Sequence, residues 1–129
     1  MTLHLLICGT RSFADYPLLC AKLDALTANY SAVEVVSGCA RGADTLGEQW
    51  AAERGHSVKR FPADWVRYGR RAGYIRNMDM ANDLLSLREP TMVVAFWDGE
   101  SRGTKDMIDV AREAGLSVRV VATGAPPTH

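Results

Sequence analysis

The sequence has no surplus of charge of either sign and no long hydrophobic run. Its 15 lysines and arginines balance its 15 aspartates and glutamates, so the formal net charge is zero. Proteins that bind nucleic acids through the phosphate backbone usually carry clustered excess Lys and Arg, so this balance argues against a nucleic acid as the main partner. No segment has the length of a membrane span, and the first residues lack the basic and apolar regions of a signal peptide. The sequence therefore predicts a cytoplasmic protein with no membrane partner.

Cysteine is also scarce. Cys8 and Cys20 lie in apolar segments, which is typical of buried free thiols, whereas Cys39 lies in a glycine-containing loop and is expected to be more exposed. No pair of Cys or His residues has the spacing of metal ligands. The sequence therefore predicts no metal site and no required cofactor.

Five short apolar segments alternate with amphipathic ones. Strands are predicted at residues 3–8, 33–37, 57–61, 91–96 and 117–122. Three of them are almost continuously apolar, which is typical of strands that are covered on both faces of a parallel sheet. The alternation predicts an α/β fold, with a doubly wound, mainly parallel five-stranded sheet and about four helices in a single domain over residues 1–122. Residues 123–129 are predicted to form a flexible tail.

The predicted helices carry apolar residues at helical spacing. The first begins after Asp15, and the others cover residues 43–54, 70–85 and 104–114. In the third, the expected core stripe is Tyr74, Met78, Ala81 and Leu85. That helix has further apolar residues, and we take the group of Met78, Met80 and Leu84 as a sign of self-association into a homodimer or a higher homo-oligomer.

Ligands of open parallel sheets bind at the carboxyl ends of the strands, so the loops that follow the strands are the candidate site. The first such loop offers a glycine for close backbone approach, two hydroxyls and a guanidinium suited to phosphate. Its candidate ligand-binding residues are Gly9, Thr10, Arg11 and Ser12.

The second loop contains small residues and two glycines before a helix, a pattern that leaves backbone amides free to bind an anion. It is neither a Walker loop nor a dinucleotide-binding fingerprint. Its candidate residues are Ser37, Gly38, Cys39, Ala40, Arg41, Gly42 and Asp44. Asp44 either caps the helix or contacts ribose hydroxyls or a catalytic water.

The loop after residues 91–96 is a second glycine-bearing turn into a helix. Its candidate residues are Trp97, Gly99, Ser101, Gly103 and Thr104. Thr104 is suited to cap the helix and to bind a phosphate oxygen. Two such loops on neighbouring strands would suit a ligand with one phosphate or a diphosphate.

An aromatic connection follows residues 57–61. Trp65 and Tyr68 there either stack on a base or pack within the loop. Of the residues that begin the third helix, Arg76 and Asn77 are expected to face the ligand, and most of the other arginines are expected to be solvated.

Taken together, these segments resemble the YspA-like branch of the SLOG superfamily. The resemblance is carried, in order along the chain, by Gly9-Thr10-Arg11 with Phe13, Asp15 and Tyr16; by Ser37 to Asp44; by Phe61 to Trp65; by Ala72-Gly73 with Arg76, Asn77 and Met80; and by Ala95 to Thr104. It implies a Rossmann-like fold and a pocket for a nucleotide or a nucleotide-derived ligand. The superfamily also contains the LOG phosphoribohydrolases and the DNA-processing protein DprA.

Two positions depart from the family pattern. Cys39 stands where relatives usually have glycine. The position of the catalytic glutamate of LOG hydrolases holds Met107, with Asp106 beside it, although Arg76 matches the LOG arginine. The candidate catalytic residues are therefore Asp44, Arg76 and Asp106.

The sequence leads to one main hypothesis and two alternatives. The main hypothesis is a protein that binds an adenine nucleotide, ADP-ribose or a related ligand as a sensor or carrier. The first alternative is a nucleotide N-glycosidase that uses Asp44 or Asp106, and the second is a DprA-like protein that binds single-stranded DNA.

Overall fold

The computed structural model describes residues 1–124, so residues 125–129 of the predicted tail lie outside the described residues. The fold is built on one five-stranded sheet in the order β3-β2-β1-β4-β5, and every strand pair is parallel. The strands are β1 (Thr2–Gly9), β2 (Ala32–Ser37), β3 (Ser57–Arg60), β4 (Thr91–Trp97) and β5 (Val118–Ala122). This confirms the predicted single-domain α/β fold with a doubly wound parallel sheet.

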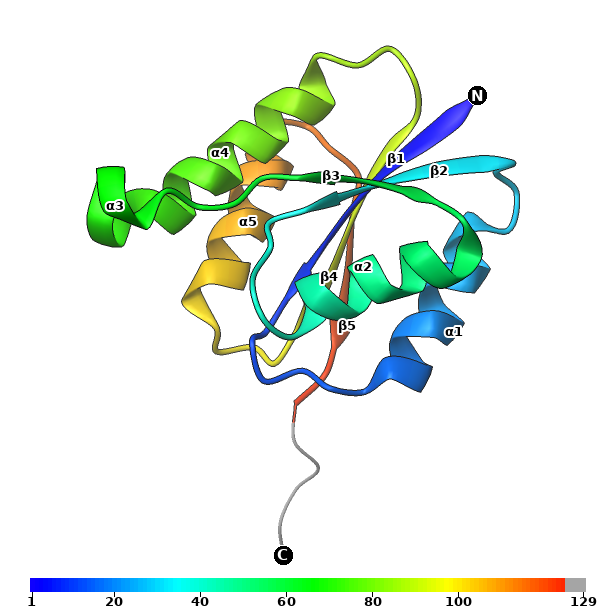
Figure 1. Ribbon diagram of the computed structural model, residues 1–129, viewed down its shortest axis with the longest axis horizontal. Coiled ribbons are helices and arrows are strands. Elements are labelled where there is room, and N and C mark those ends of the chain that lie inside the picture. Colours follow the sequence, from blue (N-terminus) through cyan, green and yellow to red (C-terminus); the bar gives the residue numbers. More distant parts are fainter. Residues whose placement is uncertain (125–129) are drawn as a thin grey trace, which may run out of the picture.

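The helices cover both faces of the sheet (Figure 1). The helices α1 (Tyr16–Thr27) and α2 (Ala43–Arg54) lie on one face, and α4 (Ala72–Leu85) and α5 (Arg102–Glu113) lie on the other. The short helix α3 (Trp65–Tyr68) and a 3₁₀ turn at Gly69–Arg71 precede α4, and α3 projects from the end of α4 in Figure 1. The sequence predicted an aromatic loop rather than a helix at α3.

The core has two parts, one on each face of the sheet. Trp50 and Phe96 are the largest side chains of the α1/α2 side, whereas Met80 and Met107 belong to the α4/α5 side. All four are essentially inaccessible to solvent. The central strand β1 contributes to both parts because its side chains alternate between the two faces.

The predicted core stripe of α4 is wrong except at Ala81. Tyr74, Met78 and Leu85 remain about half exposed. The buried residues of this helix are Ala72, Asn77, Met80, Ala81 and Leu84. The helix has two apolar stripes, and the sequence pattern did not show that the buried one includes the polar Asn77, whose side chain is paired through hydrogen bonds.

Over residues 1–124, no helix has both the length and the apolar character needed to cross a bilayer.

Candidate functional site

A cavity of about 230 Å³ opens at the carboxyl edge of the sheet. It is bounded by the end of β1, the loop between β2 and α2, the segment from α3 into α4, and the start of α5. The two glycine-containing loops follow β2 and β4, which lie on either side of β1. The prediction that these loops follow neighbouring strands is therefore wrong. Both loops nevertheless line this one cavity, through Ala40 and Asp44 on one side and Ser101, Gly103 and Thr104 on the other.

The cavity has an apolar floor and an aromatic rim. Cys8, Met80 and Met107 form the apolar part of its buried lining, beside the buried polar residues Asp44, Asn77 and Thr104. Trp65 and Tyr74 are half-exposed residues of its wall. Burial raises the pKa of the Cys8 thiol, which therefore stays neutral at physiological pH. The apolar part of the lining, together with the two aromatic side chains, suits a flat, apolar group such as a base.

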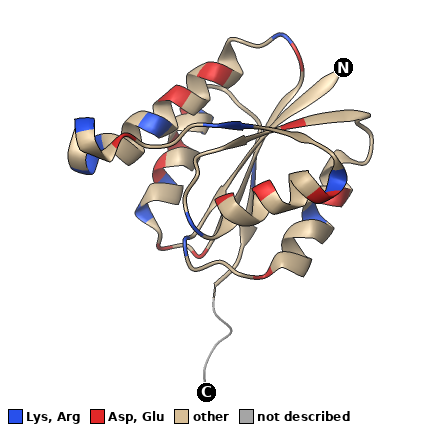
Figure 2. Cartoon of the chain, viewed as in Figure 1, with Lys and Arg blue, Asp and Glu red and all other residues tan. Residues whose placement is uncertain are grey.

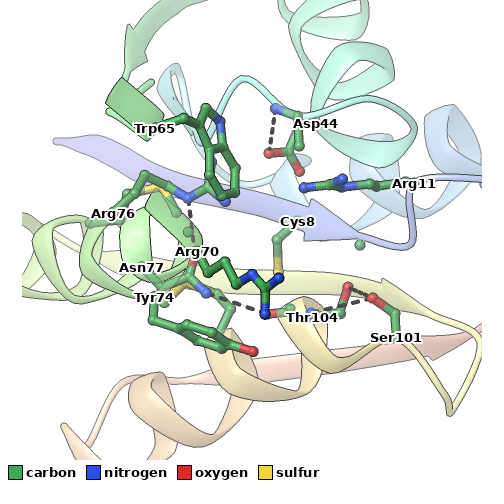
Figure 3. A pocket seen from close by; sticks show the side chains of 16 residues that line it. Cys8, Arg11, Asp44, Trp65, Arg70, Tyr74, Arg76, Asn77, Ser101 and Thr104 are labelled. Carbon is green, nitrogen blue, oxygen red and sulfur yellow. Dashed lines mark hydrogen bonds between the residues drawn. The ribbon is translucent and has the colours of Figure 1, made fainter. Parts of the chain in front are cut away.

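Three arginines line the same cavity: Arg11 from the loop after β1, Arg70 from the 3₁₀ turn, and Arg76 from α4 (Figure 3). Within residues 1–124, none of the three forms an ion pair with a carboxylate. Figure 2 shows further positive charge around α3, the helix whose Trp65 lines the cavity. Guanidinium groups without carboxylate partners make the cavity a favourable place for an anion.

Asp44 is the one acidic residue that lines this cavity among residues 1–124. It lies in the first turn of α2 with only 6% of its surface exposed, and its Oδ2 accepts a hydrogen bond from the Ala40 amide at 3.2 Å. Burial raises the pKa of Asp44 to about 6, although the Ala40 amide and the charge of Arg76 act in the opposite direction. The carboxyl group therefore changes its charge close to physiological pH.

The first turn of α5 provides hydrogen-bond donors on the opposite side of the cavity. Ser101 caps the helix, with its Oγ 3.5 Å from the Thr104 amide and 3.1 Å from the Thr104 hydroxyl. The first amides of a helix have no intrahelical acceptor, and the helix dipole favours negative charge at this end. The start of α5 therefore has the properties of an anion site.

Two adjacent residues of α4 connect the two loops. Arg76 donates from Nη1 to the carbonyl oxygen of Gly38 and from Nε to Asn77 Oδ1, the latter at 3.1 Å. Asn77 donates from Nδ2 to the carbonyl oxygen of Gly103 at 3.3 Å. Arg76 and Asn77 therefore hold the β2–α2 loop and the start of α5 at fixed positions around the cavity.

Glycine is required where the loops pack against neighbouring backbone. A Cβ at Gly9 would overlap the Phe96 carbonyl oxygen and lie 2.7 Å from the Ala43 side chain. Gly42 has a φ of 78°, and a Cβ there would overlap the Thr10 carbonyl oxygen. The loop after β1 and the loop after β2 are thus in direct backbone contact.

Cys39 has a left-handed backbone conformation, with a φ of 63°. Glycine adopts that conformation without steric cost, which accounts for the glycine that the family resemblance leads us to expect at this position. The cost for a side chain such as cysteine is about 1 kcal/mol. The Cys39 side chain is exposed and does not line the main cavity.

Of the residues predicted to bind a ligand, ten line the main cavity: Gly9, Arg11, Ala40, Asp44, Trp65, Arg76, Asn77, Ser101, Gly103 and Thr104. Gly38 and Cys39 line a smaller adjoining cavity that shares Arg11, Ala40, Trp65 and Arg76 with the first. Thr10 and Ser12 face a third cavity, on the other side of the loop after β1.

The remaining predicted residues lie outside the lining of these cavities. The Ser37 hydroxyl donates to Glu48 at 2.6 Å, and Trp97 Nε1 donates to the Ser101 carbonyl oxygen at 3.0 Å. Arg41, Gly42 and Gly99 lie in the loops themselves. Asp106 accepts from Asn77 at 3.0 Å and does not line the main cavity, whereas its neighbour Met107 does.

Six residues that line the main cavity were not predicted from the sequence to bind a ligand: Cys8, Arg70, Gly73, Tyr74, Met80 and Met107. Helical spacing could have found three of them, because Gly73, Tyr74 and Met80 lie three or four residues from Asn77 and therefore share its face of α4. Arg70 was expected to be solvated, and only its position in the turn before α4 directs it to the cavity.

Comparison with known proteins shows the family of this chain. The model of the family described as "YspA, cpYpsA-related SLOG family" matches residues 3–68, which include the first two loops of the site. The Gene 61 protein of Mycobacterium phage D29 is 32% identical over 121 residues, covering 89% of this chain and 93% of that protein. The chain therefore belongs to the YspA, cpYpsA-related SLOG family.

Proposed function

We propose that this protein binds a nucleotide or a nucleotide-derived ligand, such as an adenine nucleotide or ADP-ribose, and acts as a sensor or carrier of it. Membership of the SLOG family favours a nucleotide-related ligand. The observation that carries the proposal is the set of three arginines around a cavity that also has apolar and aromatic lining residues. Within residues 1–124 none of these arginines pairs with a carboxylate. An anionic group attached to a flat ring matches both parts of this lining.

In this proposal the phosphate lies at the start of α5. Ser101, Gly103 and Thr104 supply amides and hydroxyls, and Arg11 and Arg70 neutralise the negative charge. Trp65 and Tyr74 offer faces on which a base stacks at the mouth of the cavity.

Isothermal titration with AMP, ADP and ADP-ribose tests this function. We expect at least one of them to bind with a dissociation constant well below 1 mM. Replacing Arg70 with Gln is expected to weaken that binding about tenfold, which corresponds to about 1.4 kcal/mol. The matched control is Arg112→Gln, an exposed arginine at the other end of α5, which should leave affinity unchanged. Absence of binding tighter than about 1 mM for all three ligands would contradict the proposal.

One observation favours a second function, the hydrolysis of the bond between base and ribose. Asp44 combines burial in a cavity with a pKa near 6, which is typical of a general acid or base. In such a reaction water adds to C1′ of the ribose as the bond to the base breaks, Asp44 accepts the proton of the water, and the base leaves with a proton from solvent. Since Met107 replaces the glutamate of LOG hydrolases and Asp106 does not line the main cavity, Asp44 is the carboxylate in position for this role.

Chromatography after incubation with AMP and ADP-ribose separates the two functions. Released base that disappears in the Asp44→Asn variant would favour the hydrolase. Binding without release of base favours the sensor or carrier.

A further inference from the structure

The carboxyl group of Asp44 already fills the anion-binding part of the β2–α2 loop. Its Oδ2 is 3.2 Å from the Ala40 amide, and it would lie 2.9 Å from a Cβ at Gly38. A phosphate at the same amides would stand beside a buried carboxylate, and like charges at such short range repel strongly. The loop that sequence motifs marked as a phosphate site is thus occupied by an anion of the protein itself.

We infer that Asp44 binds a sugar hydroxyl of the ligand and selects for ribose, while the phosphate binds across the cavity at the start of α5. This inference rests on the proposed function and assigns the part of the ligand that each loop recognises. A carboxylate only accepts hydrogen bonds, and the neutral donors of an adenine nucleotide are its sugar hydroxyls and the amino group of its base. Since the base is proposed to stack on Trp65 and Tyr74 at the mouth of the cavity, the sugar hydroxyls are the donors left for Asp44. The bond from Ala40 uses one oxygen of Asp44, so lone pairs of the carboxylate remain for a ligand in the cavity.

The dimensions of the sheet are compatible with this division. Asp44 follows β2 and Ser101 follows β4, and β1 lies between these strands. Neighbouring strands are about 4.8 Å apart, so the two loops begin about 10 Å from each other. A ribose 5-phosphate with a hydrogen bond of about 3 Å at each end bridges a gap of that order.

The groups around Asp44 determine when it accepts a hydrogen bond from a hydroxyl. Arg76 of α4 favours its ionised form, Glu48 of α2 disfavours it, and Cys8 of β1 is neutral. Arg11, from the loop after β1, lines the same cavity and adds positive charge. The pKa of about 6 means that Asp44 is mostly ionised at pH 7.5 and mostly protonated at pH 5. Selection for ribose is therefore expected to be strongest on the alkaline side of pH 6.

The experiment compares the affinities of AMP, 2′-deoxy-AMP and 3′-deoxy-AMP by isothermal titration at pH 7.5 and pH 5. At pH 7.5 we expect the wild-type protein to bind at least one deoxy analogue about tenfold more weakly than AMP. At pH 5 this ratio should shrink towards one. The titration of the phosphate does not affect the ratio, because all three ligands carry the same phosphate.

Two variants identify Asp44 as the cause. Asp44→Asn keeps the size of the side chain and an acceptor for the Ala40 amide, and Asp44→Ala removes the acceptor. Both should reduce the ratio between AMP and its deoxy analogue to within about threefold. If Asp44→Ala does not fold, the ratio measured with Asp44→Asn decides whether Asp44 causes the discrimination.

The outcomes separate this inference from the proposed function. If AMP binds and the wild-type protein does not distinguish it from either deoxy analogue, the inference is wrong and the proposed function stands. The same holds if discrimination persists in both Asp44 variants. If no nucleotide binds, the proposed function and the inference fail together.

Discussion

Asn77 donates a hydrogen bond of 3.0 Å from Nδ2 to Oδ2 of Asp106, one turn into α5. The same nitrogen donates to the Gly103 carbonyl oxygen, and Oδ1 of the same side chain accepts from Arg76. With 4% of its surface exposed, Asn77 is a buried polar residue whose hydrogen bonds join α4 to the start of α5. The positions of the cavity walls thus depend on one amide side chain.

Replacing Asn77 with Leu keeps the branched shape and the number of non-hydrogen atoms of the side chain and removes these three hydrogen bonds. We expect the free energy of unfolding to fall by about 2–4 kcal/mol, because three hydrogen bonds of a buried side chain to partly exposed partners are lost. Urea denaturation measures this change. Asn82→Ala, an exposed asparagine of the same helix, should change stability by no more than about 0.5 kcal/mol. Equal effects of the two substitutions would show that the Asn77 network does not stabilise the fold.

Asp44 should make stability depend on pH. Its pKa of about 6 in the folded protein is above the ordinary value of 3.8, so ionisation destabilises the folded state as pH rises from about 4 to above 6. Asparagine is neutral throughout this range. We therefore expect the stability of Asp44→Asn relative to wild type to be about 2–3 kcal/mol more favourable at pH 7.5 than at pH 4. Urea denaturation at both pH values checks this, and a pH-independent difference would contradict the raised pKa.

Because Gly9 packs closely against the end of β4, adding a single methyl group at this position is expected to destabilise the fold strongly. Gly9→Ala forces a Cβ against the Phe96 carbonyl oxygen and the Ala43 side chain, both of which belong to the rigid core. We expect a loss of about 3 kcal/mol or more in the free energy of unfolding. Gly103→Ala is the control, because a Cβ there meets no atom within 4 Å. Thermal unfolding of the two variants should differ clearly, and similar melting temperatures would contradict the close packing at Gly9.

The exposed stripe of α4 bears on self-association. Tyr74, Met78 and Leu85 are 47%, 50% and 49% exposed, whereas Met80 and Leu84, which the sequence reading grouped with Met78, are buried in the core. We propose that two copies associate through Met78 and Leu85 of this stripe, while Tyr74 belongs to the wall of the cavity. Sedimentation should then show a dimer at micromolar concentration and a monomer for Met78→Asp, whereas Ala25→Asp on the exposed side of α1 should leave the dimer intact. A monomeric wild-type protein would refute this proposal.

The positions and the parallel direction of the strands could be predicted because apolar strand segments and capped helices alternate clearly along the chain. Their order in the sheet could not, since β1 separates β2 from β4, which the sequence prediction treated as neighbours. The start of α1 is an example, since Asp15 accepts a hydrogen bond from the Leu18 amide at 3.1 Å as its sequence position predicts. The core face of α4 could not be predicted in the same way. Its buried stripe includes Asn77, and only the tertiary partners of Asn77 make burial of that amide favourable.

The candidate site was predictable at the level of loops and less so at the level of side chains. Rules about strand ends placed Arg11, Asp44 and Thr104 in the right loops, and all three line the cavity. They did not predict that Asp44 accepts a hydrogen bond from the Ala40 amide of its own loop, or that Arg70 lines the cavity. Both facts depend on the path of the chain in three dimensions.

The backbone contact between Gly42 and Thr10 has a consequence for the energetics of binding. Since the loop after β1 lies directly against the loop after β2, neither can shift without displacing the other, and the groups they carry keep a fixed separation. The entropy lost in ordering these two loops is therefore lost during folding and not when a ligand binds. Association then loses little affinity to loop ordering, as expected of a preorganised receptor.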